Sequence, residues 1–232
     1  MYDLIGDIHG FDEPFVELLN KLGYKKINEV WQHESRVLIS LGDLIDRGPG
    51  QKKVVNILKT MQQHGKAIVL MGNHEFYAVG WDIKGPNGKP LRQHSEKNYN
   101  EHRAFLEQAS PGSVWYKEAI EWFKTLPLFF ENDHIRCIHA AWHENHIARL
   151  KVYTNDIGVI NNWTLNLCQS KQTASIDDFE FNNLKVYPNP FTLKTRVSFE
   201  SFDVQDVFIS IFDIRGRLVK SRKFSNGSPL FR

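Results

Sequence analysis

The chain has 232 residues, of which 41% are hydrophobic and 24% are charged, and its formal net charge is +2. So small a charge gives no support for a nucleic-acid partner, and no run approaches the roughly 18 apolar residues of a membrane span. We therefore expect a globular protein with neither. The two cysteines, Cys137 and Cys168, lack the spacing of a disulfide framework or a metal motif, so the chemistry is expected to lie elsewhere.

Short apolar runs alternate with amphipathic stretches in the first part of the chain. The runs predict strands, and stretches whose apolar residues recur three and four positions apart predict helices. In chain order, the predicted elements are a strand at 2–5, a helix between Asp12 and Gly23, a strand at 37–41, a helix at 51–64 and a strand at 67–71. This alternation predicts an α/β fold with a parallel sheet flanked by helices.

The pattern changes further along the chain. Residues 98–126 are predicted to form two helical pieces, followed by strands at 128–130 and 135–138. From about residue 161 the composition becomes polar, which is typical of a linker, and after residue 184 apolar and polar residues alternate as in β-strands. The predicted organisation is a domain at 1–165, a linker at 166–183 and a small β-sandwich at 184–232.

Four short motifs follow predicted strands. They are GDIHG at 6–10, GDLIDRGPG at 42–50, GNHE at 72–75 and IHA at 138–140. In an open parallel sheet the carboxyl ends of the strands converge on one crevice, so loops far apart in sequence can build one site there. The motifs therefore predict a shared site at that edge of the sheet.

The residue types in these motifs suit two metal ions. Asp7 and His9 can hold one ion, Asn73 and His139 can hold another, and Asp43 can bridge the pair with its two oxygens. Mixed imidazole and oxygen ligands suit Mn, Fe or Zn better than Ca or Mg. Two such ions, about 3.5–4 Å apart, activate a water molecule and clamp a phosphoryl group.

Three further residues complete the predicted chemistry. Arg47 offers a fork of donors for phosphate oxygens, and His74 could protonate the leaving oxygen while Asp46 orients its ring. Each feature alone has a simpler interpretation, since an Asp-Arg pair is more often a surface salt bridge and a lone histidine is usually structural. Four ligand-type loops that each follow a predicted strand favour the functional interpretation.

The motifs at 6–10, 42–50 and 72–75 resemble the signature of calcineurin-like metallophosphoesterases. Within that superfamily they are most similar to the phosphoprotein-phosphatase branch, which includes serine/threonine phosphatases and symmetrical diadenosine tetraphosphatases. The resemblance covers roughly residues 1–150. It implies a dinuclear Mn- or Fe-type centre, phosphate at Arg47, and His74 with Asp46 near the leaving group. The ligands that it implies are Asp7, His9, Asp43, Asn73 and His139.

The chain departs from the family pattern after residue 140. The family fold continues into a second sheet that supplies a further histidine to the second metal, whereas no histidine follows His146 here. His143 and His146 lie too close to His139 to occupy the required separate strand. We therefore expect the second sheet to be missing, its partner face to be left exposed, and the enzyme to be weakened or misfolded. An inactive metal-binding remnant is the alternative.

The C-terminal segment carries a second resemblance. LKVYPNPF at 184–191 and the alternating run that begins at Val207 are similar to the C-terminal sorting domain of the type IX secretion system. The resemblance implies a small β-sandwich that directs export, incomplete at Arg232, and possible contact with secretion machinery. An unrelated β-sandwich is the alternative.

The expected function is hydrolysis of a phosphate ester, with a phosphoprotein or a nucleotide polyphosphate as substrate. The stretch 82–97 is expected to be a solvated surface loop, with substrate contact as the alternative. The N-terminus has no signal-peptide pattern, which predicts a cytoplasmic protein. If the sorting-type segment is functional, the protein is instead an exported cargo. The pairing of these two parts also raises the alternative of an accidental gene fusion.

Overall fold

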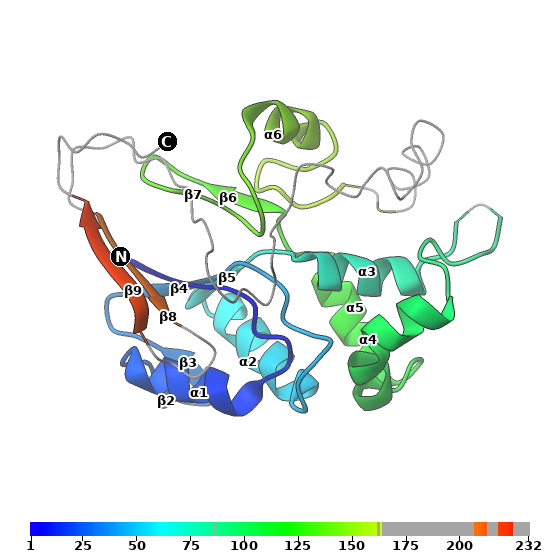
Figure 1. The fold of residues 1–232 in the computed structure, drawn as a ribbon, viewed down its shortest axis with the longest axis horizontal. Helices are drawn as coiled ribbons and strands as arrows, with labels where there is room; N and C mark the ends of the chain where they lie inside the picture. The colour runs from blue at the N-terminus through cyan, green and yellow to red at the C-terminus, as the bar shows by residue number, and fades with distance from the viewer. Residues whose placement is uncertain (86, 162, 164–206, 213–217, 225–232) are drawn as a thin grey trace.

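The computed structural model describes residues 1–85, 87–161, 163, 207–212 and 218–224. At its centre is a three-stranded sheet with the order β1-β4-β5, in which both pairings are parallel (Figure 1). Its strands are β1 (Tyr2–Ile5), β4 (Val37–Ser40) and β5 (Ala67–Val69). The predicted parallel sheet and α/β fold are confirmed.

Two helices, α1 (Asp12–Lys21) and α2 (Gln51–Gln63), cover one face of this sheet (Figure 1). Each has apolar residues recurring three and four positions apart, so one side of the helix can be buried. Together with the sheet they form a cluster that we call the helix-side core. Among its buried residues are Ile5, Phe15, Leu18, Leu19, Leu38, Val54, Val55, Leu58, Met61 and Val69.

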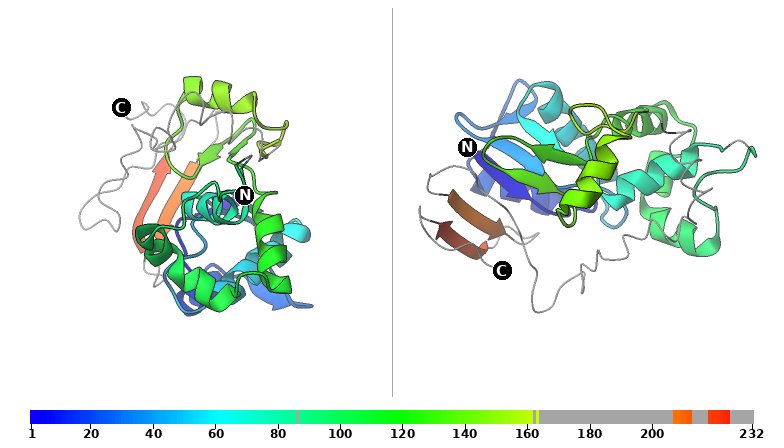
Figure 2. Two further views of the ribbon diagram at one scale, coloured as in Figure 1. Left: turned by 90° about the vertical axis from the view of Figure 1, so that its right-hand side faces the viewer. Right: turned by 90° about the horizontal axis from the view of Figure 1, so that it is seen from above.

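The opposite face of the sheet is covered by an antiparallel hairpin of β6 (Phe129–Glu131) and β7 (Arg136–Ile138), as Figure 2 shows. Buried Ile39, Leu70 and Cys137 form the hairpin-side core, with partly buried apolar side chains around them. The expectation that this face is left bare is thus corrected in part. Leu4, which pairs with Ile39, remains 40% exposed.

Two helices after the sheet match the predicted helical pieces. They are α4 (Glu96–Ala109) and α5 (Val114–Phe123), and in each the side chain of the preceding serine, Ser95 or Ser113, accepts a hydrogen bond from an N–H of the first turn. Phe105 and Phe123 are fully buried between the helices.

Three elements were not predicted. A hairpin of β2 (Lys25–Ile27) and β3 (Val30–Gln32) turns through Asn28 and Glu29, both with positive φ. Helix α3 (Asn73–Asp82) begins inside the GNHE motif, and α6 (Glu144–Lys151) follows His143. Helix α3 has no clear amphipathic period, because its buried residues include the consecutive run 78–81.

Near the C-terminus, β8 (Val207–Phe212) and β9 (Leu218–Phe224) form an antiparallel hairpin, as the alternating pattern predicted. The predicted linker at 166–183, the motif at 184–191 and Cys168 lie outside the described residues. Among the helices of the described residues, none is both long enough and apolar enough to cross a membrane.

Candidate metal centre

The loops that follow β1, β4 and β5 leave the sheet at one edge, because the strands are parallel. The N–H groups of Ile8 and His9 both donate to the carbonyl oxygen of Asp43, at 2.9 and 2.8 Å, and fasten the first loop to the second. His9, Asp43 and Asp46 have φ angles of 50°, 54° and 91°. Positive φ is strained for residues with a side chain and clusters at functional sites. The strained backbone thus marks these three residues as candidates for the functional site.

Glu75, to which the sequence reading gave no function, ties the second loop to the third. Its fully buried carboxylate accepts hydrogen bonds from the backbone N–H groups of Asp43 (2.9 Å), Leu44 (2.8 Å) and Gly72 (3.0 Å). Gly72 permits this approach, because a Cβ there would lie 2.3 Å from the backbone nitrogen of Asp43. Burial and the charge of Asp43 raise the pKa of Glu75 to about 7.

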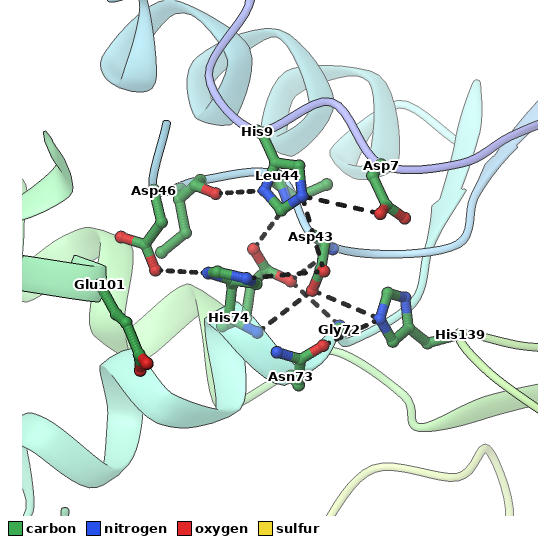
Figure 3. A network of polar contacts seen from close by, with 12 residues as sticks. Asp7, His9, Asp43, Leu44, Asp46, Gly72, Asn73, His74, Glu101 and His139 are labelled. Carbon is green, nitrogen blue, oxygen red and sulfur yellow. Dashed lines mark hydrogen bonds and ion pairs between the residues drawn. The ribbon is translucent and has the colours of Figure 1, made fainter. Parts of the chain in front are cut away.

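The first donor group consists of Asp7, His9 and Asp43 (Figure 3). His9 Nε2 lies 3.6 Å from Asp7 Oδ2 and 3.9 Å from Asp43 Oδ2. His9 Nδ1 donates to the carbonyl oxygen of Ile45 at 2.8 Å, which leaves the lone pair of Nε2 directed toward the carboxylates. That Nε2 is buried and has no hydrogen-bond partner among the described residues.

The second donor group consists of Asp43, Asn73 and His139. His139 Nε2 lies 3.4 Å from Asp43 Oδ1 and 3.1 Å from Asn73 Oδ1, while its Nδ1 donates to the carbonyl oxygen of Leu41 at 2.8 Å. The two oxygens of Asp43 therefore face different histidines. Oδ2 faces His9 and Oδ1 faces His139 (Figure 3).

The spacing in both groups fits metal ligation. An ion held at about 2.0–2.2 Å by each donor keeps neighbouring donors roughly 3–4 Å apart. The separations here run from 3.1 Å to 3.9 Å. Histidine ligands commonly donate their second ring N–H to a carbonyl or carboxylate oxygen, as His9 and His139 both do. The residues present therefore fit divalent metal ions.

Electrostatics support the same interpretation. Burial raises the pKa of Asp43, but hydrogen bonding and charge from His139, with the charge of His74, lower it overall. Burial lowers the pKa of His139, yet Asp43 raises it overall to about 9. Because the nearby oxygens of Asp43 and Asn73 are both acceptors, a positive charge is favoured between them. A proton on His139 Nε2 supplies that charge, and a metal ion meets the same need.

The predicted pair of His74 and Asp46 is brought together. His74 Nδ1 donates to Asp46 Oδ2 at 2.7 Å, and His74 Nε2 lies 3.8 Å from Asp43 Oδ2. Burial opposes protonation of His74, but its bond to Asp46 and the charges of Asp43 and Asp46 raise its pKa. Donor atoms of His9, Asp43 and His74 also lie within 4.8 Å of one another, so the geometry admits His74 as a ligand as well as a proton donor.

A third histidine reaches this pair, and sequence reasoning missed it. His102 Nδ1 donates to the other oxygen of Asp46, Oδ1, at 2.6 Å. His102 lies in α4, in a stretch that reads simply as an amphipathic helix. The one available signal was a histidine three residues before Phe105, on the buried side of that helix.

Two arginines near the site differ in exposure. Arg47 is exposed, and the described contacts do not bring its guanidinium into the donor groups. Arg92, expected on a solvated loop, has a side chain only 10% exposed. Its guanidinium lies over the ring of Tyr77, 4.3 Å from the centroid, and pairs with Glu101 at 2.8 Å. Burial lowers the pKa of Arg92, against the opposing charges of Glu101 and Asp46.

Two histidines lie at or just before the start of α6. His143 and His146 are exposed, and their rings stack on each other with centroids 4.5 Å apart. Neither belongs to the metal-type groups found among the described residues.

A parallel sheet whose strand-end loops gather histidine, aspartate and asparagine donors defines a class of metal-dependent α/β hydrolases. The family model for calcineurin-like phosphoesterases matches residues 2–188, and the chain belongs to this family. Members of the family use divalent metal ions. The resemblance read from the motifs is confirmed, and the match extends well beyond residue 150.

Two curated relatives of this chain carry the same protein name. The bis(5'-nucleosyl)-tetraphosphatase PrpE [asymmetrical] of Halalkalibacterium halodurans is 38% identical over 154 residues, which cover 63% of this chain and 59% of that protein. The protein of the same name from Anoxybacillus flavithermus is 44% identical over 75 residues, covering 32% of this chain and 31% of that protein. The chain thus spans less than two thirds of the length of these relatives.

Solved structures and a second family model complete the comparisons. A crystal structure of a putative diadenosine tetraphosphatase is 21% identical, with a TM-score of 0.39, and the match covers 61% of this chain and 50% of that one. A cold-active protein-tyrosine phosphatase of a Shewanella species is 21% identical, with a TM-score of 0.46. That match covers 64% of this chain and 44% of the other. The model of the secretion system C-terminal sorting domain matches residues 185–229, as the second resemblance predicted.

Proposed function

We propose that the chain hydrolyses a phosphate ester with the help of two divalent metal ions. The observation that carries the proposal is the position of Asp43, whose two oxygens face histidines of separate donor groups. When bound, such a pair of ions lowers the pKa of a water molecule and stabilises charge on the phosphoryl oxygens. Mn or Fe fits the mixed imidazole and oxygen donors best, and Zn is the alternative.

The chain itself holds and orients the reacting groups. Asp7, His9 and Asp43 hold one ion, and Asp43, Asn73 and His139 hold the other. Loss of a residue that only hydrogen-bonds to a metal ligand costs about 10–100-fold in metal affinity or activity. Removal of a shared ligand such as Asp43 is therefore expected to cost at least as much.

Two further groups act on the substrate. His74, protonated on both ring nitrogens, gives its Nε2 proton to the leaving oxygen, while its Nδ1–H donates to Asp46 and sets the orientation of the ring. Arg47 directly follows Asp46 in the sequence and is exposed. Its planar guanidinium binds phosphate oxygens with a fork of donors.

Nucleotide polyphosphate is the favoured substrate class, because the names of the curated relatives point in that direction. A phosphoprotein remains the alternative. The products of a dinucleoside tetraphosphate distinguish the modes of cleavage, since symmetrical attack releases two nucleoside diphosphates and asymmetrical attack releases a monophosphate and a triphosphate. Chromatography of the products after incubation with Mn²⁺ distinguishes the two modes of cleavage.

The first experiment measures metal content per chain and hydrolysis of an aryl phosphate on the same sample. The expected result is two ions and turnover, and at least about 100-fold less turnover in Asp43→Asn. Asp133→Asn, which changes an exposed aspartate in the turn between β6 and β7, is the matched control and keeps full activity. No turnover above the Asp43→Asn background would favour an inactive metal-binding remnant.

We also propose that the segment matched by the sorting-domain model directs export. The protein is then surface-sorted or secreted rather than cytoplasmic, and its partner is the secretion machinery. Expression in a host with type IX secretion tests this, by comparing the full chain with a chain that ends at residue 183. Equal retention of both chains inside the cell would overturn the proposal.

A further inference from the structure

Asp46 is held between two imidazole rings. Its Oδ2 accepts a hydrogen bond from His74 Nδ1 at 2.7 Å, and its Oδ1 accepts one from His102 Nδ1 at 2.6 Å. The side chain of Asp46 is 1% exposed, so these two rings take the place of water around it. Both hydrogen bonds lower the pKa of Asp46, against the opposing effect of burial, and keep it an acceptor.

His102 is placed where its ring has little freedom to turn. It is fully buried on α4, its ring stacks on that of Phe105 with centroids 5.1 Å apart, and the ring of Trp81 lies 5.7 Å away. A buried histidine whose ring is fixed by aromatic neighbours is a rigid support for the group that it contacts.

The backbone of Asp46 is fixed as well. Its N–H donates to the side-chain oxygen of Gln51 at 2.9 Å, and its φ angle is 91°. With the main chain held and Oδ1 bonded to His102, only Oδ2 faces His74. The Nδ1–H of His74 is thereby held on Oδ2, and Nε2 is directed toward Asp43, 3.8 Å away.

We propose that His102 is a positioning residue for the hydrolytic reaction, which acts through Asp46 to hold the His74 ring in the orientation that presents its Nε2–H to the leaving oxygen. The inference rests on the proposed function, in which His74 Nε2 protonates the leaving oxygen. His102 itself touches neither donor group. A purely structural histidine would instead support α4 without any influence on the leaving-group step.

The test compares two substitutions. His102→Phe keeps a flat ring in the aromatic pocket but removes the donor to Asp46. His102→Asn keeps a donor near the place of Nδ1 and is the conservative rescue. Phe105→Leu is the matched control, because it disturbs the same pocket without touching Asp46.

The first readout is the dependence of turnover on the leaving group. Proton donation matters most for poor leaving groups, so His102→Phe is expected to lower turnover of phenyl phosphate about 10–100-fold and that of 4-nitrophenyl phosphate by less than about tenfold. Metal content stays unchanged, His102→Asn restores part of the loss, and Phe105→Leu leaves the ratio of the two substrates as in the parent. Equal losses on both substrates would overturn the proposal.

The second readout needs no turnover. Side-chain NMR of the metal-free protein reports whether the Nδ1–H of His74 is hydrogen-bonded, through the shift of that proton and its rate of exchange with solvent. We expect a hydrogen-bonded, slowly exchanging Nδ1–H in the parent chain and a faster-exchanging one in His102→Phe. An unchanged His74 signature in a folded His102→Phe chain would overturn the inference, whereas a parent chain without turnover would overturn the proposed function alone.

Discussion

The two faces of the central sheet are covered very differently. The helix-side core has α1, α2 and a large set of buried residues, whereas the hairpin-side core buries Ile39, Leu70 and Cys137 under β6 and β7. The metal centre draws on both sides. The side chain of His9 is 6% exposed and belongs to a loop tied to the sheet, while the side chain of His139 is 18% exposed and follows the hairpin. One donor group is thus supported by the large helix-side core and the other by the small hairpin-side core.

The strongest way to test this contrast is to remove one histidine at a time. His9→Ala and His139→Ala should each lower activity at least about 100-fold, since each removes a metal ligand. His139→Ala is expected to retain one tightly held ion, because the first donor group keeps Asp7, His9 and Asp43 in place. Elemental analysis after dialysis gives the count. Loss of both ions from His139→Ala would show that the two groups are not independent.

Neighbouring residues on β4 compare the two cores directly. Leu38 lies in the helix-side core and Ile39 in the hairpin-side core, and both are fully buried. Leu38→Ala should lower the free energy of unfolding by about 4 kcal/mol and Ile39→Ala by about 2 kcal/mol, because a two-stranded hairpin can settle into a cavity more easily than packed helices. Urea denaturation measures both. Equal losses would contradict a thin hairpin-side core.

The elements that form the helix-side core could be predicted from the sequence. The amphipathic periods of α1 and α2, the strands between them and the motif residues at the strand ends are local patterns, and parallel topology converts them into one site. The hairpin cover of Ile39 and Leu70 was not foreseen, because it depends on packing between segments far apart in the chain. Contacts such as that of His102 with Asp46 likewise join elements 56 residues apart and leave no local pattern.

Glu75 offers a test of how firmly the first donor group is supported. Glu75→Ala removes the acceptor of three backbone N–H groups, and buried donors left without partners cost about 1–3 kcal/mol each. We expect a loss of about 3 kcal/mol in the free energy of unfolding, because water can enter the space and satisfy part of this need. Glu75→Gln, which keeps one acceptor oxygen, is the control and should lose less. Full stability of Glu75→Ala would contradict the buried network.

The last prediction concerns the thiol of Cys137, which lies in the hairpin-side core. Burial raises its pKa to about 12, and the residue is 5% exposed, so the thiol of the closed hairpin is protonated and shielded. At pH 8 we expect labelling roughly 1000-fold slower than for an ordinary exposed thiol, because the closed hairpin offers so little thiolate.

Peptide mass spectrometry on a Cys168→Ser background follows Cys137 alone. Metal should slow its labelling further, since His139 follows β7 and would tie the hairpin to an ion at Asp43. If Mn²⁺ left the rate unchanged while elemental analysis showed a second bound ion, the hairpin would move independently of the metal centre. The contrast between the two faces would then concern packing alone and would not extend to the donor groups.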